Sequence, residues 1–261
     1  MQAEIGIIGG TGVYDPTLLR NVREMKLRTP YGAPSDAISI GELEGRKIAF
    51  IPRHGRKHTI RPTDINSRAN IYALKKLGVQ RILAPSAVGS LKEEYRPGDT
   101  VIIDQFIDKT TKREQSFYTG KQVCHISVAD PMCPQLRDTL IKTAEEMKIR
   151  YHKTGTYVCI EGPRFSTKAE SKMHRGWGAD IIGMTLVPEC VLAREAEICY
   201  ACIATVTDYD VWKDHLVNAE EVAKTMKQNI DKIKTLIRKA IATLPKKRTC
   251  ECEHALKSAL V

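Results

Sequence analysis

The stretch EIGIIGGTG at residues 4–12 is a short apolar strand that runs directly into a cluster of glycines. A second strand is predicted at residues 47–51, where β-branched and aromatic residues occur. Further along the chain, apolar strand segments alternate with segments of helical periodicity, which indicates a mostly parallel sheet with helices on both faces. The expected fold class is therefore α/β: a single domain with a mixed, mostly parallel, twisted sheet flanked by helices.

The remaining elements are predicted from apolar periodicity and from helix start and stop signals. Asp64 is the expected N-cap of a helix over residues 65–77, which Gly78 ends. Further strands are expected at residues 81–84, 100–107, 158–160, 179–182 and 199–206, and further helices at residues 133–147, 168–177, 188–197 and 219–242.

The composition is that of an ordinary globular protein. The chain has 261 residues, of which 42% are hydrophobic and 28% charged, and this excludes a collagen-like or disordered polymer. No apolar run reaches the roughly 18–20 residues of a membrane span. The N-terminal residues MQAE lack the basic region and apolar core of a secretory signal. We therefore expect a cytoplasmic enzyme with no membrane partner.

Positive charge is concentrated near the C-terminus. The formal net charge is +10, and residues 222–261 hold ten Lys and Arg against three acidic residues, which gives +7 for this segment. A basic segment can bind nucleic acid. Here, however, apolar residues recur at helical spacing between the lysines, and no aromatic residue is present for base stacking. The pattern favours a solvated helix face and no nucleic-acid partner, with a domain over residues 1–245 and a basic tail over residues 246–261.

The eight cysteines leave several interpretations open. The chain lacks the two Cys-x2-Cys pairs of a typical four-cysteine zinc motif, and no His lies at zinc-ligand spacing from a Cys, so no metal site is expected. The close pair Cys250-Glu251-Cys252 is interpreted either as an exchange-prone disulfide or as two free surface thiols.

Three segments that each follow a predicted strand carry groups suited to an anion. The glycine stretch offers backbone N–H groups and the Thr11 hydroxyl. Residues 52–56 (PRHGR) offer Arg53 and His54, and a turn at residues 85–90 (PSAVGS) offers small residues and hydroxyls. A dinucleotide-binding turn and a purely structural turn remain alternatives for the glycines, although no helix follows them before the next strand. The three segments together predict one phosphate site.

Five motifs occur in an order that resembles a known family: IGIIGGTG at 5–12, RHGRKHTI at 53–60, EGPRFS at 161–166, GMTLVPE at 183–189 and TDYD at 207–210. With these motifs, the chain from about residue 4 to residue 240 resembles the 5′-methylthioadenosine phosphorylases, in the trimer-forming branch of the purine nucleoside phosphorylases. The resemblance implies phosphorolysis of 5′-methylthioadenosine to adenine and 5-methylthioribose 1-phosphate. It also implies a homotrimer or a dimer of trimers, no cofactor, and inorganic phosphate as co-substrate.

The resemblance also implies roles for individual residues. The positions implied to contact phosphate are Thr11, Arg53, His54, Ser86, Ala87 and Thr185. The positions implied to contact the nucleoside are Phe165, Ser166, Met184, Asp208, Tyr209 and Asp210, together with His125 from a neighbouring subunit. Ala219 is aligned with the wall of the 5′ pocket, where the family often carries Val.

The chemistry of the reaction accounts for these residue types. Breaking the bond between ribose and a purine builds positive charge on the sugar and negative charge on the base, so an acid such as Asp208 can protonate the base as it leaves. An enclosed phosphate stabilises the ribosyl cation and then captures C1′. Desolvation is expected to raise the pKa of Asp208.

The residues that face the base predict its identity. The 6-amino group of adenine donates hydrogen bonds to carboxylates, whereas a 6-oxopurine presents an acceptor. The related 6-oxopurine phosphorylases carry Asn at the position of Asp208 and Glu at the position of Ser166. The sequence therefore favours a 6-aminopurine, and a methylthioinosine or broad-specificity purine nucleoside phosphorylase is the alternative.

Overall fold

The apolar strand that opens the chain lies inside the sheet. In the computed structural model, which describes residues 2–10, 18–213 and 217–261, β1 (Ile5–Gly9) runs parallel to β4 (Arg46–Pro52) on one side and to β5 (Arg81–Ser90) on the other. All five residues of β1 are buried. A parallel strand covered on both faces needs a continuous apolar run, and this is what residues 5–9 provide.

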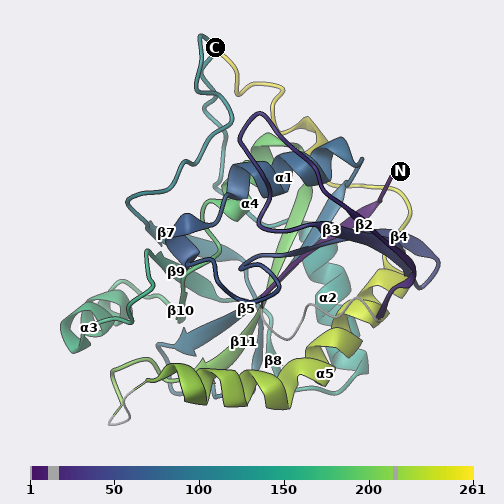
Figure 1. The fold of residues 1–261 in the computed structure, drawn as a ribbon. Coiled ribbons are helices and arrows are strands. Elements are labelled where there is room, and N and C mark those ends of the chain that lie inside the picture. Colours follow the sequence, from purple (N-terminus) through teal and green to yellow (C-terminus); the bar gives the residue numbers. More distant parts are fainter. Residues whose placement is uncertain (1, 11–17, 214–216) are drawn as a thin grey trace.

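The described residues form one eleven-stranded twisted sheet (Figure 1). Six of its ten strand pairings are parallel, so the expected mixed, mostly parallel sheet is confirmed. The main order is β2-β3-β4-β1-β5-β10-β9-β7. In addition, β11 pairs with β5 and β6, and β6 pairs with β8. The strands not yet given are β2 (Arg20–Met25), β3 (Ile38–Leu43), β6 (Thr100–Ile102), β7 (Gln105–Lys109), β8 (Tyr151–His152), β9 (Thr156–Ile160), β10 (Ile181–Gly183) and β11 (Cys199–Asp208).

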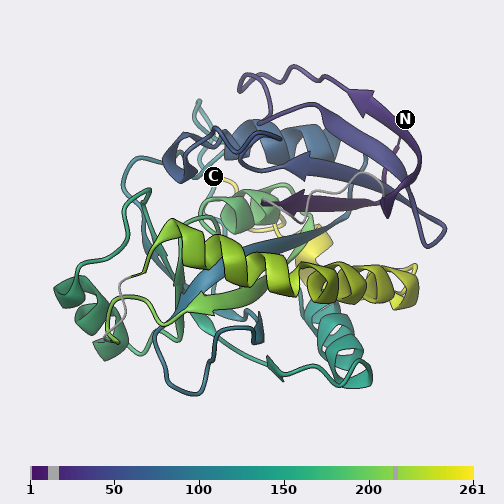
Figure 2. The same ribbon diagram turned by 60° about the horizontal axis from the view of Figure 1, so that its bottom comes forward.

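Helices cover both faces of the sheet (Figure 2). On one face, α1 (Ser67–Lys76) packs against α4 (Glu189–Glu195), and their apolar residues belong to one core cluster. On the other face, α2 (Pro134–Glu146) packs against α5 (Ala219–Thr243) and forms a second cluster. α3 (Lys168–Gly176) stands apart at the side of the molecule, and the 3-10 turns η2 (Pro62–Asp64) and η3 (Glu251–His254) complete the described elements.

Several predicted boundaries were wrong. Asn66, not Asp64, caps α1, because the Asn66 side chain accepts the N–H of Ala69 while Asp64 ends η2. The strand expected over residues 100–107 is two strands that pair with different partners. β2 and β3 were not predicted; β2 is an edge strand whose residues are mostly exposed and carry no continuous apolar run.

β5 continues through the segment that was predicted to be a turn at residues 85–90. Its pairing with β1 ends at Leu83 and its pairing with β10 begins at Gly89, so between them β11 is its only partner among the residues that the structure describes. Proline is tolerated where one side of a strand has no hydrogen-bonding partner. The stretch from Pro85 to Val88 therefore has one open edge, and this edge faces the cavity described below.

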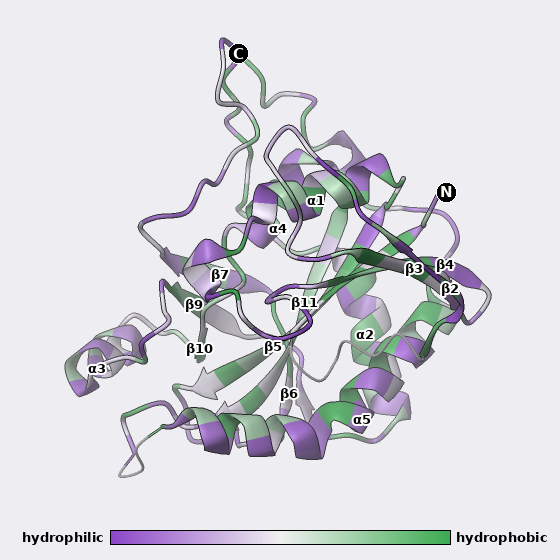
Figure 3. Ribbon diagram, viewed as in Figure 1, coloured by the Kyte–Doolittle hydropathy of each residue, from purple (hydrophilic) through white to green (hydrophobic). Residues whose placement is uncertain are grey.

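The basic C-terminal segment is largely a solvated helix face, as predicted. α5 buries Ile233, Leu236, Ile237, Ala240 and Ile241 and turns its charged residues outward (Figure 3). The segment after it packs on the domain, where Leu244, Cys250 and Cys252 join the cluster formed by α2 and α5. The interpretation of Cys250 and Cys252 as surface thiols was wrong, since both are buried, and all eight cysteines are free thiols. None of the described helices combines the length and apolarity needed to span a membrane.

Candidate active site

A cavity of about 720 Å³ lies where the carboxyl ends of the central parallel strands meet. β1, β4, β5 and β11 all run in one direction, so the residues at their ends gather at one edge of the sheet. The lining therefore comes from segments far apart in the sequence: Gly10, Arg53 and His54, residues 85–89, residues 182–185, and Thr207, Asp208 and Asp210. The phosphate segments and the acidic motif predicted from sequence thus share one cavity.

Arg53 lies at this edge, fully enclosed. Its Nε and Nη2 donate to both carboxylate oxygens of Glu189 at 2.8 Å, Nη1 donates to the carbonyl oxygen of Pro85 at 3.1 Å, and Nη2 donates to that of Ile8 at 3.0 Å. Four of its five N–H groups are bound in this way, which leaves one for a ligand. The sequence interpretation of a guanidinium fork free for phosphate needs correction, because Glu189 occupies the fork.

His54 lies beside Arg53 in the cavity wall. Burial, reinforced by the positive charge of Arg53, lowers the pKa of His54 to about 4, so the ring is neutral at pH 7. Nδ1 lies 2.9 Å from the carbonyl oxygen of Ile60, a contact that requires the proton on Nδ1. Nε2 is then left as an acceptor, which suits a phosphate that carries a proton.

Two hydroxyls from different strands meet in the same part of the cavity. Ser86 Oγ in β5 lies 3.2 Å from Thr185 Oγ1, just beyond β10. Both residues line the cavity, as do Ala87 and Gly10. Thr11, the other residue predicted to bind phosphate, lies outside the described residues.

The predicted acids follow β11. Asp208 Oδ1 accepts the N–H of Asp210 at 2.8 Å, and Oδ2 accepts the hydroxyl of Thr207 at 2.7 Å. Burial raises the pKa of Asp208 despite these hydrogen bonds, and burial likewise raises the pKa of Asp210. Gly89 makes room for this arrangement, because a Cβ there would lie 2.8 Å from Asp208 Oδ1.

Two buried polar atoms in the cavity lining lack a hydrogen-bond partner among the described residues. They are Ser166 Oγ and Asp210 Oδ2. Buried polar groups are nearly always hydrogen-bonded in folded proteins, so each such atom calls for an explanation. A ligand that donates hydrogen bonds to Asp210 and bonds to Ser166 would satisfy both.

The rest of the cavity is mostly apolar, with His58 and Lys227 as its polar side chains. Five residues along one side of α5 line the cavity, at the i, i+3, i+4, i+7 and i+11 positions of a helix face: Ala219, Val222, Ala223, Met226 and Ile230. Phe165 (38% exposed) and Met184 line other parts of it. Gly183 is required by packing, since a Cβ there would lie 2.0 Å from the hydroxyl of Tyr157.

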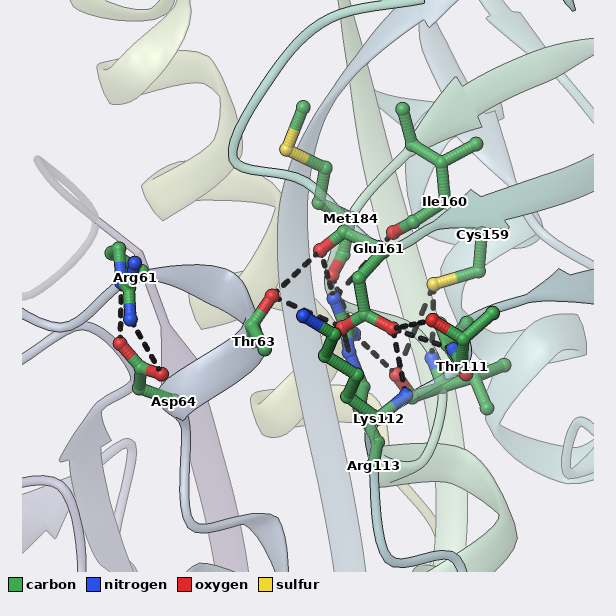
Figure 4. A network of polar contacts seen from close by, with 12 residues as sticks. Arg61, Thr63, Asp64, Thr111, Lys112, Arg113, Cys159, Ile160, Glu161 and Met184 are labelled. Carbon is green, nitrogen blue, oxygen red and sulfur yellow. Dashed lines mark hydrogen bonds and ion pairs between the residues drawn. The ribbon is translucent and has the colours of Figure 1, made fainter.

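A polar network behind the cavity fixes the two segments that carry Met184 and Ile160 (Figure 4). Arg113 donates from Nη1 to the carbonyl oxygens of Met184 and Val187 at 2.7 and 2.6 Å, and from Nη2 to that of Glu161 at 2.6 Å. The Glu161 carboxylate in turn accepts Arg113 Nε at 3.0 Å. Arg113 is therefore a positioning residue for both segments.

Two residues predicted from sequence are not brought into the cavity. The Tyr209 hydroxyl donates to the carbonyl oxygen of Glu93, and its ring packs edge-on against Trp212. Asp208 and Asp210 line the cavity, whereas Tyr209 does not. The predicted contact of Tyr209 with substrate therefore has no counterpart in the lining of this cavity. His125 is exposed on a segment whose backbone N–H binds the carbonyl oxygen of Ala259, outside the cavity of its own chain.

Sequence reasoning missed several residues of the site. Glu189 and Arg113 act through buried contacts with segments distant in the sequence, and no local pattern marks them. His58, Val222 and Met226 also line the cavity. The helical spacing of Val222 and Met226 was visible in the sequence, but it indicated only a helix face and not what that face covers.

Comparison with known proteins agrees with this geometry. Residues 4–242 match the family described as the phosphorylase superfamily. The chain is 56% identical over 260 residues to the S-methyl-5′-thioadenosine phosphorylase of Thermofilum pendens, covering 100% of this chain and 99% of that one. A methylthioadenosine phosphorylase from an antarctic soil metagenomic library superposes with a TM-score of 0.95 at 47% identity, covering 100% and 93% of the two chains. The Schistosoma mansoni methylthioadenosine phosphorylase in complex with adenine gives 0.93 at 38% identity, covering 98% and 97%.

The network around Glu161 predicts an acid-sensitive contribution to stability. Burial alone would raise the pKa of Glu161, but hydrogen bonds from the backbone N–H of Thr111 and from Arg113 outweigh it and lower the pKa to about 2. A lowered pKa stabilises the fold above the unfolded-state value, and this contribution is lost as the pH falls through the folded-state value. We expect Glu161→Gln to lower the free energy of unfolding by about 1–3 kcal/mol at pH 7. Urea unfolding of wild type and variant should show this difference shrinking as the pH falls from about 4.5 to about 2. A difference that stays constant over this range would contradict the assigned network.

Proposed function

Since the chain belongs to the phosphorylase superfamily, we propose that its cavity carries out phosphorolysis of 5′-methylthioadenosine, giving adenine and 5-methylthioribose 1-phosphate. One observation carries this assignment. The Ser86–Thr185 hydroxyl pair, with Arg53 and His54, and the desolvated acids Asp208 and Asp210 line the same cavity. The first group suits an anion, and the second suits the hydrogen-bond donors of a 6-aminopurine.

The phosphate end of the cavity binds its anion through directed donors. We assign this role to the remaining N–H of Arg53, the hydroxyls of Ser86 and Thr185, and the backbone along the open edge of β5. Nε2 of neutral His54 accepts a hydrogen bond from the O–H of a monoprotonated phosphate. The Arg53 charge is already balanced by Glu189, so the negative charge of the phosphate remains available to the sugar cation that forms beside it.

The base end of the cavity receives the leaving group. The bond between N9 and C1′ breaks, its electron pair moves to the purine, and a phosphate oxygen forms the new bond to C1′. Asp208 donates a proton to N7 of the departing base, and burial, which raises its pKa, favours the protonated form that this step requires. Asp210 accepts a hydrogen bond from the 6-amino group, which gives its unpartnered Oδ2 a donor. Ser166 forms a hydrogen bond with the edge of the base. No step requires a cofactor; inorganic phosphate is the co-substrate.

The apolar face of α5 selects the 5′ substituent. Ala219, Val222, Ala223 and Met226 offer no polar partner to a 5′-hydroxyl, whereas a methylthio group buries its surface against them. The difference between a methylthio group and a hydroxyl in an apolar pocket changes kcat/KM by about 10- to 200-fold. Methylthioadenosine is therefore the preferred substrate over adenosine.

The most informative test incubates the protein with methylthioadenosine, adenosine and inosine, each with and without inorganic phosphate, and measures the free base. We expect rapid release from methylthioadenosine, slower release from adenosine, little from inosine, and none in the absence of phosphate. Release of adenine that ignores phosphate would indicate a hydrolase and overturn the proposal. Equal rates with inosine would favour a broad-specificity enzyme.

Substitution of Asp208 tests its role as the acid. We expect Asp208→Asn to lower kcat/KM for methylthioadenosine by about 10²- to 10⁴-fold, because an amide cannot deliver the proton. The loss on inosine should be smaller, since Asn can donate to a 6-oxopurine. Asp231→Asn, on the exposed side of α5, is the matched control and should leave both rates unchanged. Unchanged turnover of both substrates by Asp208→Asn would contradict the role.

We further propose that the enzyme acts in the cytoplasm as a homotrimer or a dimer of trimers, with His125 completing the cavity of a neighbouring subunit. This is supported by the exposed position of His125 outside the cavity of its own chain.

Complementation between two inactive variants tests this sharing. Chains carrying His125→Ala and chains carrying Asp208→Asn should each have low activity alone. When they are unfolded together and refolded as a mixture, about a quarter of the sites should combine an intact Asp208 with an intact neighbouring His125. We expect activity to recover to about that fraction of wild type. No recovery in mixed oligomers of confirmed composition would show that His125 does not act across subunits.

A further inference from the structure

Four cysteines converge at a point away from the residues that line the cavity. Cys133 lies directly before α2, Cys199 is the first residue of β11, and Cys250 and Cys252 come from the C-terminal segment. All four side chains are buried, and their Sγ atoms all lie within 4.8 Å of one another. Neither the proposed reaction nor the cavity involves any of them.

The spacing of the sulfur atoms fits a tetrahedral metal ion. A zinc ion with four thiolates at about 2.3 Å places the sulfur atoms about 3.8 Å apart. Cys250 Sγ lies 3.6 Å from Cys133 Sγ and 3.4 Å from Cys199 Sγ. Both separations exceed the roughly 2.05 Å of a disulfide S–S bond, so these two contacts are not disulfide bonds. A set of four sulfur ligands in this arrangement is typical of zinc or iron–sulfur sites.

The backbone around the cluster is fixed by polar contacts. The N–H of Cys133 donates to the carbonyl oxygen of Tyr200 at 2.9 Å, which ties the start of α2 to the start of β11. Arg81 Nη2 donates to the carbonyl oxygen of Pro245 at 3.0 Å, and Arg248 Nη1 donates to that of Glu197 at 2.9 Å. These contacts hold the C-terminal segment so that Cys250 and Cys252 point at the other two cysteines.

A positive side chain adjoins the cluster. Arg194 Nη1, from α4, lies 3.8 Å from Cys252 Sγ as a donor. A divalent metal with four thiolates carries a net charge of −2, and a guanidinium beside one sulfur offsets part of it. Outer contacts of this kind orient and tune metal ligands.

We propose that Cys133, Cys199, Cys250 and Cys252 bind one zinc ion as a structural site. Binding releases four protons, one from each thiol, and forms four zinc–sulfur bonds with no change of oxidation state. Because all four ligands come from the protein, the ion has no open position for a substrate. The site fastens the C-terminal segment to the start of α2 and of β11.

The decisive experiment measures metal and thiols in the same wild-type sample. The protein is produced without an affinity tag, dialysed without chelator, and analysed by elemental mass spectrometry, while its thiols are titrated in denaturant with a chelator. We expect one zinc per chain and eight reactive thiols. Eight thiols with no metal would overturn the proposal, and so would a denatured mass lowered by the four hydrogens that two disulfides release.

Cobalt substitution and two variants complete the test. Co²⁺ added to metal-free wild type should give the intense visible absorption of a tetrahedral thiolate site, saturating at one ion per chain. Cys252→Ser should weaken metal binding by more than the roughly 10- to 100-fold typical of an outer-shell change. The control Cys202→Ser, buried in the same strand as Cys199 but outside the cluster, should retain full metal content. Absence of the cobalt spectrum, or equal metal content in both variants, would contradict the assignment.

Discussion

The buried ion pair between Arg53 and Glu189 is the contact around which the cavity is arranged. Its guanidinium joins the end of β4 to the start of α4 and also binds carbonyl oxygens of Ile8 in β1 and Pro85 in β5. Such a pair adds little net stability, because desolvation offsets much of the attraction, but loss of one partner leaves a buried charge at a cost of about 3–5 kcal/mol. Its main consequence is geometric: the ends of β1 and β4, the middle of β5 and the start of α4 are fixed at one point.

The open edge of β5 places the functional groups of the site next to this ion pair. β1 leaves β5 after Leu83 and β10 joins it at Gly89, so the backbone between them faces the cavity instead of another strand. At one end of this stretch Ser86 meets Thr185, and at the other Gly89 makes room for Asp208. A single strand thus spans both halves of the site and sets the separation between the anion and the acid.

The sequence was sufficient to predict the mostly parallel sheet and the segments that meet at the cavity, because each depends on a pattern within a short stretch. The continuation of β5 through Pro85 could not be predicted, because a strand accepts a proline only where one of its edges has no pairing strand, and this depends on the tertiary fold. Glu189 was missed because its partner is 136 residues away in the sequence. The burial of Cys250 and Cys252 was missed for a similar reason: nothing in the spacing along the chain shows that the fold brings four thiols together from three separate segments.

In the proposed mechanism, an anion held at the Arg53–His54 end of the cavity captures C1′ of the sugar as the base departs at Asp208. Phosphorus NMR of the enzyme turning over methylthioadenosine in inorganic phosphate observes this transfer directly. The proposed mechanism predicts that the phosphate signal declines and a sugar 1-phosphate ester signal appears in the same amount as the adenine released. Adenine released while the phosphate signal keeps its full intensity would contradict it.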